Sequence, residues 1–158
     1  MHNFKIQQSI KLFIMSENSS KPNPLFWIVG VIALVWNLLG VSAYLMQAYQ
    51  TDSFKAMYEP EQLEIITNMP AWATAAFGVA VFGGALGSLV LLLRKKLANI
   101  LFVLSFIGII VQFIYNFFIA NSMEVYGPGS LIMPILTIAF GLFLIVYSKN
   151  CIKKGWLS

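Results

Sequence analysis

The segment WATAAFGVAVFGGALGSLVLLLRKKLANILFVLSFIGIIVQFIYNFFIA, residues 72–120, decides the fold of this chain. It contains two apolar runs, residues 72–93 and 97–120, separated by the basic triplet at 94–96. A helix that crosses the hydrocarbon core of a bilayer needs about 20 mostly apolar residues, with a working range of about 17–25. Both runs have this length, and a helix satisfies its own backbone hydrogen bonds in lipid. The segment therefore predicts two spanning helices joined by a short basic turn.

Two further apolar runs flank this pair, at residues 25–46 and 131–148. The last run is shorter and contains Pro134, and none of the four runs contains Asp, Glu, Lys, Arg or His. The sequence predicts an all-α integral membrane four-helix bundle over residues 24–148. A polar and basic cytoplasmic segment, residues 1–23, is expected before it, and a basic cytoplasmic tail, residues 149–158, after it.

Composition favours lipid as the solvent. The chain has 158 residues, of which 59% are hydrophobic and 10% charged, whereas a soluble domain is about 25% charged. The net charge is +4, but the charges stand at the ends of the apolar runs, so nucleic acid is not an expected partner. The expected partner is a lipid bilayer.

Charge asymmetry predicts the orientation. The basic residues expected on one side are Lys5, Lys11, Lys21, Arg94, Lys95, Lys96, Lys149, Lys153 and Lys154, and only Lys55 is expected on the other. The acidic residues expected on the Lys55 side are Asp52, Glu59, Glu61, Glu64 and Glu124, with Glu17 opposite. Because cytoplasmic loops are enriched in Lys and Arg, both termini are predicted to be cytoplasmic (N-in/C-in).

Residues 1–14 have two interpretations. Met15 precedes a polar, breaker-rich stretch and would serve as the natural start, which leaves residues 1–14 outside the native protein. Alternatively, residues 1–14 form a short amphipathic helix on the membrane surface. Between the first two spans, Glu59-Pro60-Glu61 resembles a helix start, and Met69 is expected on the membrane surface.

Uncharged polar residues inside the predicted spans suggest a binding pocket. These residues are Asn37, Tyr44, Thr74, Gln112, Tyr115, Asn116 and Thr137. Asn37 is expected near the middle of the membrane and the others in its outer half. A pocket built from them suits a neutral, hydrogen-bonding ligand. The alternative is that the amides bond only to each other and hold helices together.

Small residues at helical spacing predict close helix packing. They are Gly30, Gly40, Ala76, Ala80, Gly83, Gly84, Gly87, Ser88, Gly108 and Gly141.

The sequence lacks the residues that several kinds of metal or catalytic site require. The chain has one cysteine, Cys151, and one histidine, His2, so a zinc site of the His/Cys type is not expected. Cys151 is expected to be an unmodified thiol, with palmitoylation as the alternative. No catalytic triad or phosphate-binding loop is present, so neither enzymatic activity nor a cofactor is expected.

From about Pro24 to Ser158 the chain resembles a group of small four-span bacterial membrane proteins, often labelled sugar transporter by automatic transfer. The motifs that carry the resemblance are Trp36-Asn37 with Tyr44, Pro70-Ala71-Trp72, residues 81–88 (VFGGALGS), Leu93-Arg94-Lys95-Lys96, Gln112 with Tyr115-Asn116, Tyr126-Gly127-Pro128-Gly129 and Gly155-Trp156-Leu157-Ser158. The resemblance implies a membrane location more firmly than it implies transport.

Two functions are therefore expected. The first is a small carrier or channel for a neutral polar solute such as a sugar, for which a homodimer would supply a wider bundle. The second is a structural or accessory membrane protein with no transport activity. A third, an enzyme acting on lipid or quinone, is supported by nothing beyond the pocket.

Overall fold

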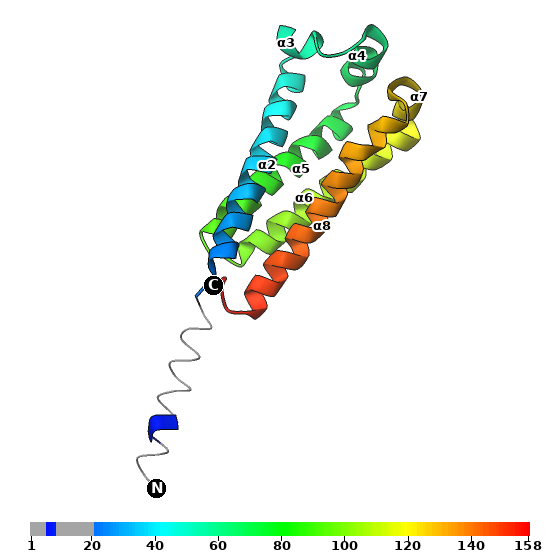
Figure 1. Cartoon of the computed structure of the whole chain (residues 1–158). Helices are drawn as coiled ribbons and strands as arrows, with labels where there is room; N and C mark the ends of the chain where they lie inside the picture. The colour runs from blue at the N-terminus through cyan, green and yellow to red at the C-terminus, as the bar shows by residue number, and fades with distance from the viewer. Residues whose placement is uncertain (1–5, 9–20) are drawn as a thin grey trace.

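The structure is a computed structural model that describes residues 6–8 and 21–158. The described part of the chain is helical and contains no strand (Figure 1). Four of its helical segments are long and apolar enough to cross a membrane: Pro24–Ala48, Ala71–Leu92, Leu97–Ile119 and Pro128–Lys153. The predicted all-helical class and the four candidate spans are therefore confirmed. The interpretations of residues 1–14 fall almost entirely outside the described residues.

The first long helix is α2 (Pro24–Ala48), and two short helices follow it, α3 (Asp52–Lys55) and α4 (Pro60–Thr67). Asn23 caps α2 by accepting a hydrogen bond from the Phe26 amide at 3.1 Å, and Pro24 occupies the first turn, where its missing N–H costs nothing. The side chain of Gln62 accepts from the Glu59 amide at 3.2 Å, so α4 begins at the predicted Glu-Pro-Glu signal.

The second pair of long helices is α5 (Ala71–Leu92) and α6 (Leu97–Ile114). A π-helical turn, η1 (Tyr115–Ile119), continues α6. The short helices α7 (Ser122–Tyr126) and η2 (Pro128–Leu131) then lead into α8 (Ile132–Lys153). The last helix continues to Lys153, past the end of the predicted run at 148, and this extension includes the polar residues Lys149, Asn150 and Lys153.

The long helices pack in chain order. Helix α2 packs against α5, α5 against α6, and α6 against α8. Between the first and last helices, the rings of Trp36 and Phe140 meet with their centroids 5.4 Å apart. Helices α3 and α4 lie across the end of the molecule opposite to the C-terminus (Figure 1).

The main hydrophobic core lies at one end of the helices. Its buried members are Phe26, Ala33, Leu91, Ala98, Phe102, Leu144, Cys151 and Leu157. They come from the first half of α2 and α6, from the second half of α5 and α8, and from the C-terminal tail. Because the long helices alternate in direction, these segments meet at one end of the molecule (Figure 1). Phe54, Ala73 and Tyr115 are buried toward the opposite end without belonging to this cluster.

The C-terminal tail closes the end that holds the core. The Arg94 Nε atom donates to the Trp156 carbonyl at 2.9 Å, and the Ser158 amide donates to the Arg94 carbonyl at 2.8 Å. Leu157 is only 2% exposed, and the ring of Trp156 meets Phe26 edge to face at 6.0 Å. The tail is thus part of the packed structure.

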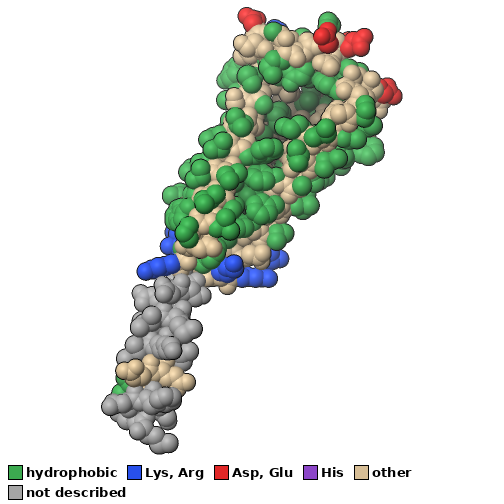
Figure 2. All heavy atoms as spheres, viewed as in Figure 1, with side chains coloured by type: hydrophobic (Ala, Val, Ile, Leu, Met, Phe, Trp, Pro, Cys, Tyr) green, Lys and Arg blue, Asp and Glu red, His purple; other side chains and the backbone are tan. Residues whose placement is uncertain are grey.

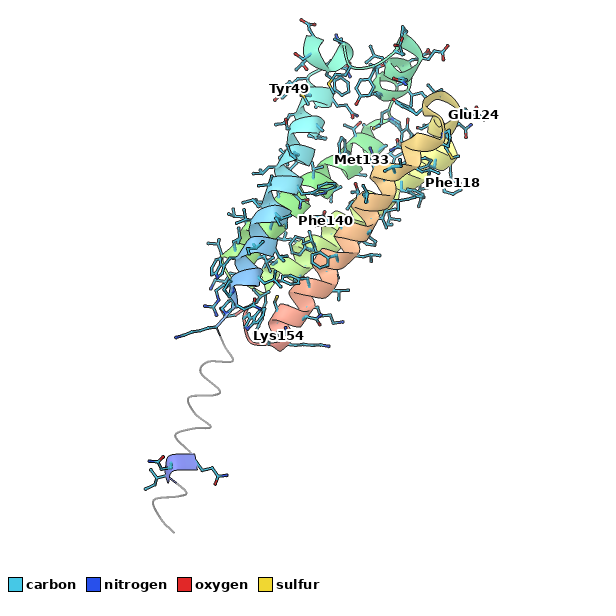
Figure 3. All side chains as sticks on the ribbon, viewed as in Figure 1. Tyr49, Phe118, Glu124, Met133, Phe140 and Lys154 are labelled. Carbon is cyan, nitrogen blue, oxygen red and sulfur yellow. The ribbon has the colours of Figure 1, made fainter. Side chains whose placement is uncertain are left out.

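Charge separates along the long axis. Lys and Arg side chains gather at the end that holds the core, and Asp and Glu side chains at the opposite end (Figure 2). Lys154 lies at the basic end, and Tyr49 and Glu124 lie at the acidic end (Figure 3).

Candidate functional site

The small residues of α5 stand where it meets its neighbours. Gly84 is buried between Asn37 of α2 and Ser105 of α6: a Cβ atom on Gly84 would overlap Asn37 Oδ1 and lie 3.2 Å from Ser105 Oγ. Ser88, one turn further along α5, is fully buried and donates to the Gly84 carbonyl at 2.8 Å. The stripe expected from Ala76 to Ser88 therefore includes positions in contact with both neighbouring helices.

Helices α5 and α6 approach each other closely at Gly108. A Cβ atom on Gly108 would lie 2.7 Å from the Ala76 carbonyl oxygen and 2.8 Å from the Ala80 nitrogen. Ser105 Oγ donates to the Ala80 carbonyl, which adds a hydrogen bond across the contact. Because Gly108 faces backbone atoms, no side-chain rotation could make room for a larger residue.

The other small residues face side chains. Gly83 lies against Ser105 and Gly87 against Phe102. The remaining close pairs are Gly30 with Leu92, Gly40 with Val81, and Gly141 with Phe106. These glycines let helices approach closely enough for dispersion contacts, which stabilise helix association in lipid.

Asn37 belongs to the α2–α5 contact. Its Nδ2 atom donates to the Ala33 carbonyl at 2.8 Å and to Ser88 Oγ at 3.4 Å. Asn37 precedes Gln47 on the same helix by ten residues, which corresponds to about 15 Å of helix. Gln47 and Gln112 both contact the Met69 side chain, so Gln112 lies near the Gln47 end of α2 and not beside Asn37.

Gln112 instead forms an amide–thioether cluster with Gln47 and Met69. Gln47 Nε2 lies 3.6 Å from Met69 Sδ, and Gln112 Nε2 lies 3.7 Å from the same sulfur atom. Gln112 Oε1 is buried and has no hydrogen-bond donor among the described residues. An unpaired buried acceptor costs about 1–3 kcal/mol, so a polar partner at this position would stabilise the fold.

Tyr115 follows Gln112 on the same side of α6. Its ring meets Trp72 edge to face with centroids 5.4 Å apart, and it is 5% exposed. Thr74 Oγ1 donates to the Pro70 carbonyl at 3.4 Å. The segment from Met69 to Thr74 therefore meets two of the predicted pocket residues, Gln112 and Tyr115.

Tyr115 also lines an open depression of about 440 Å³ at the acidic end. The other lining residues are Glu61, Glu64, Ile65, Asn68, Ala120 and Val125. The surface is hollowed just below the loop that carries the acidic side chains (Figure 2). The π-helical turn that begins at Tyr115 widens α6 here, and such turns are frequent at functional sites.

The remaining predicted pocket residues are Tyr44, Asn116 and Thr137. The Tyr44 ring packs against Phe77 and Phe82 at 5.5 and 5.6 Å. Thr137 Oγ1 donates to the Met133 carbonyl of its own helix at 2.8 Å. Asn116 is half-buried next to Tyr115. None of these contacts joins Tyr44 or Thr137 to Gln112 or Tyr115.

Two polar contacts between helices could not be predicted from the sequence. Asn99 Nδ2 donates to the Ile145 carbonyl at 3.0 Å and to Ser148 Oγ at 2.9 Å, which joins α6 to α8. Tyr126 Oη donates to the Gln62 carbonyl at 3.2 Å, which joins α7 to α4. Burial, with a smaller contribution from Tyr58, raises the pKa of Tyr126 to about 12.

Within residues 6–8 and 21–158, no three His, Cys, Asp or Glu side chains lie close enough together to hold a metal ion. No family model, no curated protein and no solved structure matches this chain.

Proposed function

We propose that this chain is a multi-pass protein of a bacterial inner membrane that carries or conducts a neutral polar solute such as a sugar. The four helices form the membrane bundle, and both termini are cytoplasmic. The separation of basic and acidic residues to opposite ends supports this orientation, because Lys and Arg are retained on the cytoplasmic side.

The observation that carries the proposal is the uneven packing of the two halves. The main core and the docked tail lie at the basic end, which corresponds to a closed cytoplasmic side. Toward the acidic end, amides of α2 and α6 meet through one weak acceptor, the Met69 thioether, and the buried Gln112 amide oxygen has no donor in the described chain. The basic half also has one buried polar atom without a partner there, the Tyr147 hydroxyl, so the amide–thioether contact is what distinguishes the acidic half. An outward-facing carrier would need such an arrangement, with polar groups available on the outer side.

A structural or accessory role is the second candidate. It is favoured by the contacts of Asn37, Ser105 and Asn99, since each of these side chains bonds to a neighbouring helix. A homodimer is compatible with either function, because α8 exposes large apolar side chains such as Ile132 and Val146 along its length.

Solute flux distinguishes the two candidates. The full chain in liposomes should release radiolabelled D-sorbitol faster than protein-free liposomes, and Gln112→Ala should reduce that rate while keeping the melting temperature near that of the parent. Met133→Leu, at an exposed position of α8, is the matched control and should release sorbitol like the parent. If flux never exceeds that of protein-free liposomes, the carrier proposal fails and the structural role stands.

A further inference from the structure

We propose that Gln47, Met69 and Gln112 form a binding site for a hydroxyl group of a neutral polyol, and that the Met69 side chain is a displaceable cover over the two amides. This inference rests on the proposed function, since it names the solute class and the residues that recognise it. The residues come from α2, from the loop before α5, and from α6.

The cluster has mismatched hydrogen-bonding groups. Two amide nitrogens, which are strong donors, lie 3.6 and 3.7 Å from a single thioether sulfur, which is a weak acceptor. Beside them, Gln112 Oε1 is a strong acceptor that no donor of the described chain reaches. The residues alone therefore leave both donor and acceptor capacity unused.

A hydroxyl group removes this mismatch. Its hydrogen can be donated to Gln112 Oε1, and its oxygen can accept from the Nε2 atoms of Gln47 and Gln112. A single group that both donates and accepts is needed, because the donors and the acceptor belong to the same cluster. Polyols and sugars present such groups without a net charge.

Charged ligands fit less well. An anion would engage the amide donors but would leave Gln112 Oε1 without a donor. The acidic end also carries Asp52, Glu59, Glu61, Glu64 and Glu124 against Lys55 alone, so an anion would be repelled on approach. A metal cation would engage Gln112 Oε1 and leave the amide hydrogens without an acceptor.

Met69 is suited to act as a cover. Its side chain is unbranched and flexible, so it can leave the amides at little cost and pack elsewhere. It is only partly buried, and it lies one residue before Pro70, which begins the entry into α5. Displacement of the thioether would release both amide donors toward an incoming hydroxyl group.

The test is a binding measurement on the full chain in nanodiscs. Saturation-transfer NMR with D-sorbitol should give a saturable signal, and Gln112→Leu should weaken the apparent affinity about tenfold or more, since the acceptor and one donor are lost together. Met69→Leu keeps the volume and removes the sulfur, so it should bind sorbitol as tightly as the parent or tighter. Met133→Leu is the matched methionine control and should leave the affinity unchanged.

The outcomes separate this inference from the proposed function. If Gln112→Leu fails to fold, Gln47→Leu, which lies near the outer end of α2, should show the loss instead. If the site holds only water, the parent protein should give no saturable sorbitol signal. If sorbitol binds elsewhere, the parent and whichever variant folds, Gln112→Leu or Gln47→Leu, should bind it with equal affinity. Either result overturns the inference. Saturable binding that depends on these residues, without flux in liposomes, would keep the site and reject transport.

Discussion

The Oδ1 atom of Asn37 on α2 lies so close to Gly84 on α5 that it would overlap a Cβ atom at that position. A polar side chain on one helix thus fills the space left by the missing side chain on the other. The amide nitrogen of Asn37 reaches Ser88 one turn along α5, so packing and hydrogen bonding coincide at this crossing. Residues 84 and 37 should therefore depend on each other energetically.

Gly84→Ala should destabilise the protein by about 1–3 kcal/mol, because the new methyl group would overlap the Asn37 amide. Removal of that amide makes room for the methyl group, so the double variant Gly84→Ala/Asn37→Ala should recover part of the loss. The measurement is a double-mutant cycle of unfolding in detergent. Gly129→Ala is the matched control, since a Cβ atom there meets nothing within 4 Å. Strictly additive effects of the two substitutions would contradict the proposed dependence.

The contact of α6 with α8 provides a second prediction. Asn99 donates to both the Ile145 carbonyl and the Ser148 hydroxyl, and Ser148 is fully buried. Hydrogen bonds between helices in membranes average about 0.6 kcal/mol and reach about 1.7 kcal/mol. Asn99→Leu should therefore lower the free energy of unfolding by about 1–2 kcal/mol.

Ser148→Ala tests the same contact between α6 and α8 by removing only the hydroxyl group that accepts from Asn99. It should cost less than Asn99→Leu, because Asn99 would keep its bond to the Ile145 carbonyl. Unfolding in detergent measures both variants. A Ser148→Ala variant less stable than Asn99→Leu would show that the contact depends on the packing of the hydroxyl and not on the amide.

The apolar runs predicted the long helices well because hydrophobic length is a local property. The two candidate spans observed here, Ala71–Leu92 and Leu97–Ile119, begin and end within one residue of the predicted runs 72–93 and 97–120. The predicted run ends at 148 and α8 ends at Lys153, because a helix can continue beyond its apolar residues into polar ones. A charged residue shows where a spanning helix leaves the hydrocarbon core of the bilayer, and it does not show where the helix itself ends.

The amide–thioether cluster could be predicted only in part. Gln112 is one of the uncharged polar residues that the sequence identifies inside the spans, but its meeting with Gln47 at Met69 depends on how a loop residue folds back between α2 and α6. Periodicity carries no information about such a contact. Asn37 is another polar residue that the sequence identifies inside a span, but its depth on α2 separates it from Gln112 and pairs it with Ser88.

The orientation is a third prediction. Both termini should be cytoplasmic and the loop with Glu59 and Glu64 should be external, because the basic residues gather at the opposite end. Reporter fusions at Ser158 and next to Glu61 measure this: the first should be active with a cytoplasmic reporter and the second with a periplasmic one. A periplasmic signal from Ser158 would reverse the orientation. The proposed outer site would then face the cytoplasm.

The last prediction concerns pH at the acidic end, where Tyr126 joins α7 to α4 by donating to the Gln62 carbonyl. Burial first, and then Tyr58, raises the pKa of Tyr126 to about 12, above the ordinary value near 10. A group whose pKa is raised in the folded state contributes its full stability below the unfolded pKa and loses it as pH rises through the folded pKa. The contribution of Tyr126 to stability should therefore be constant below pH 10 and disappear between about pH 10 and 12.

Thermal unfolding at several pH values measures this contribution as the difference in melting temperature between the parent and Tyr126→Phe, which cannot ionise or donate. That difference should shrink or reverse across the window, while Tyr49→Phe, at a position 77% exposed, should follow the parent throughout. A difference that stays constant to pH 12 would mean that the phenol hydrogen bond does not hold α7 against α4.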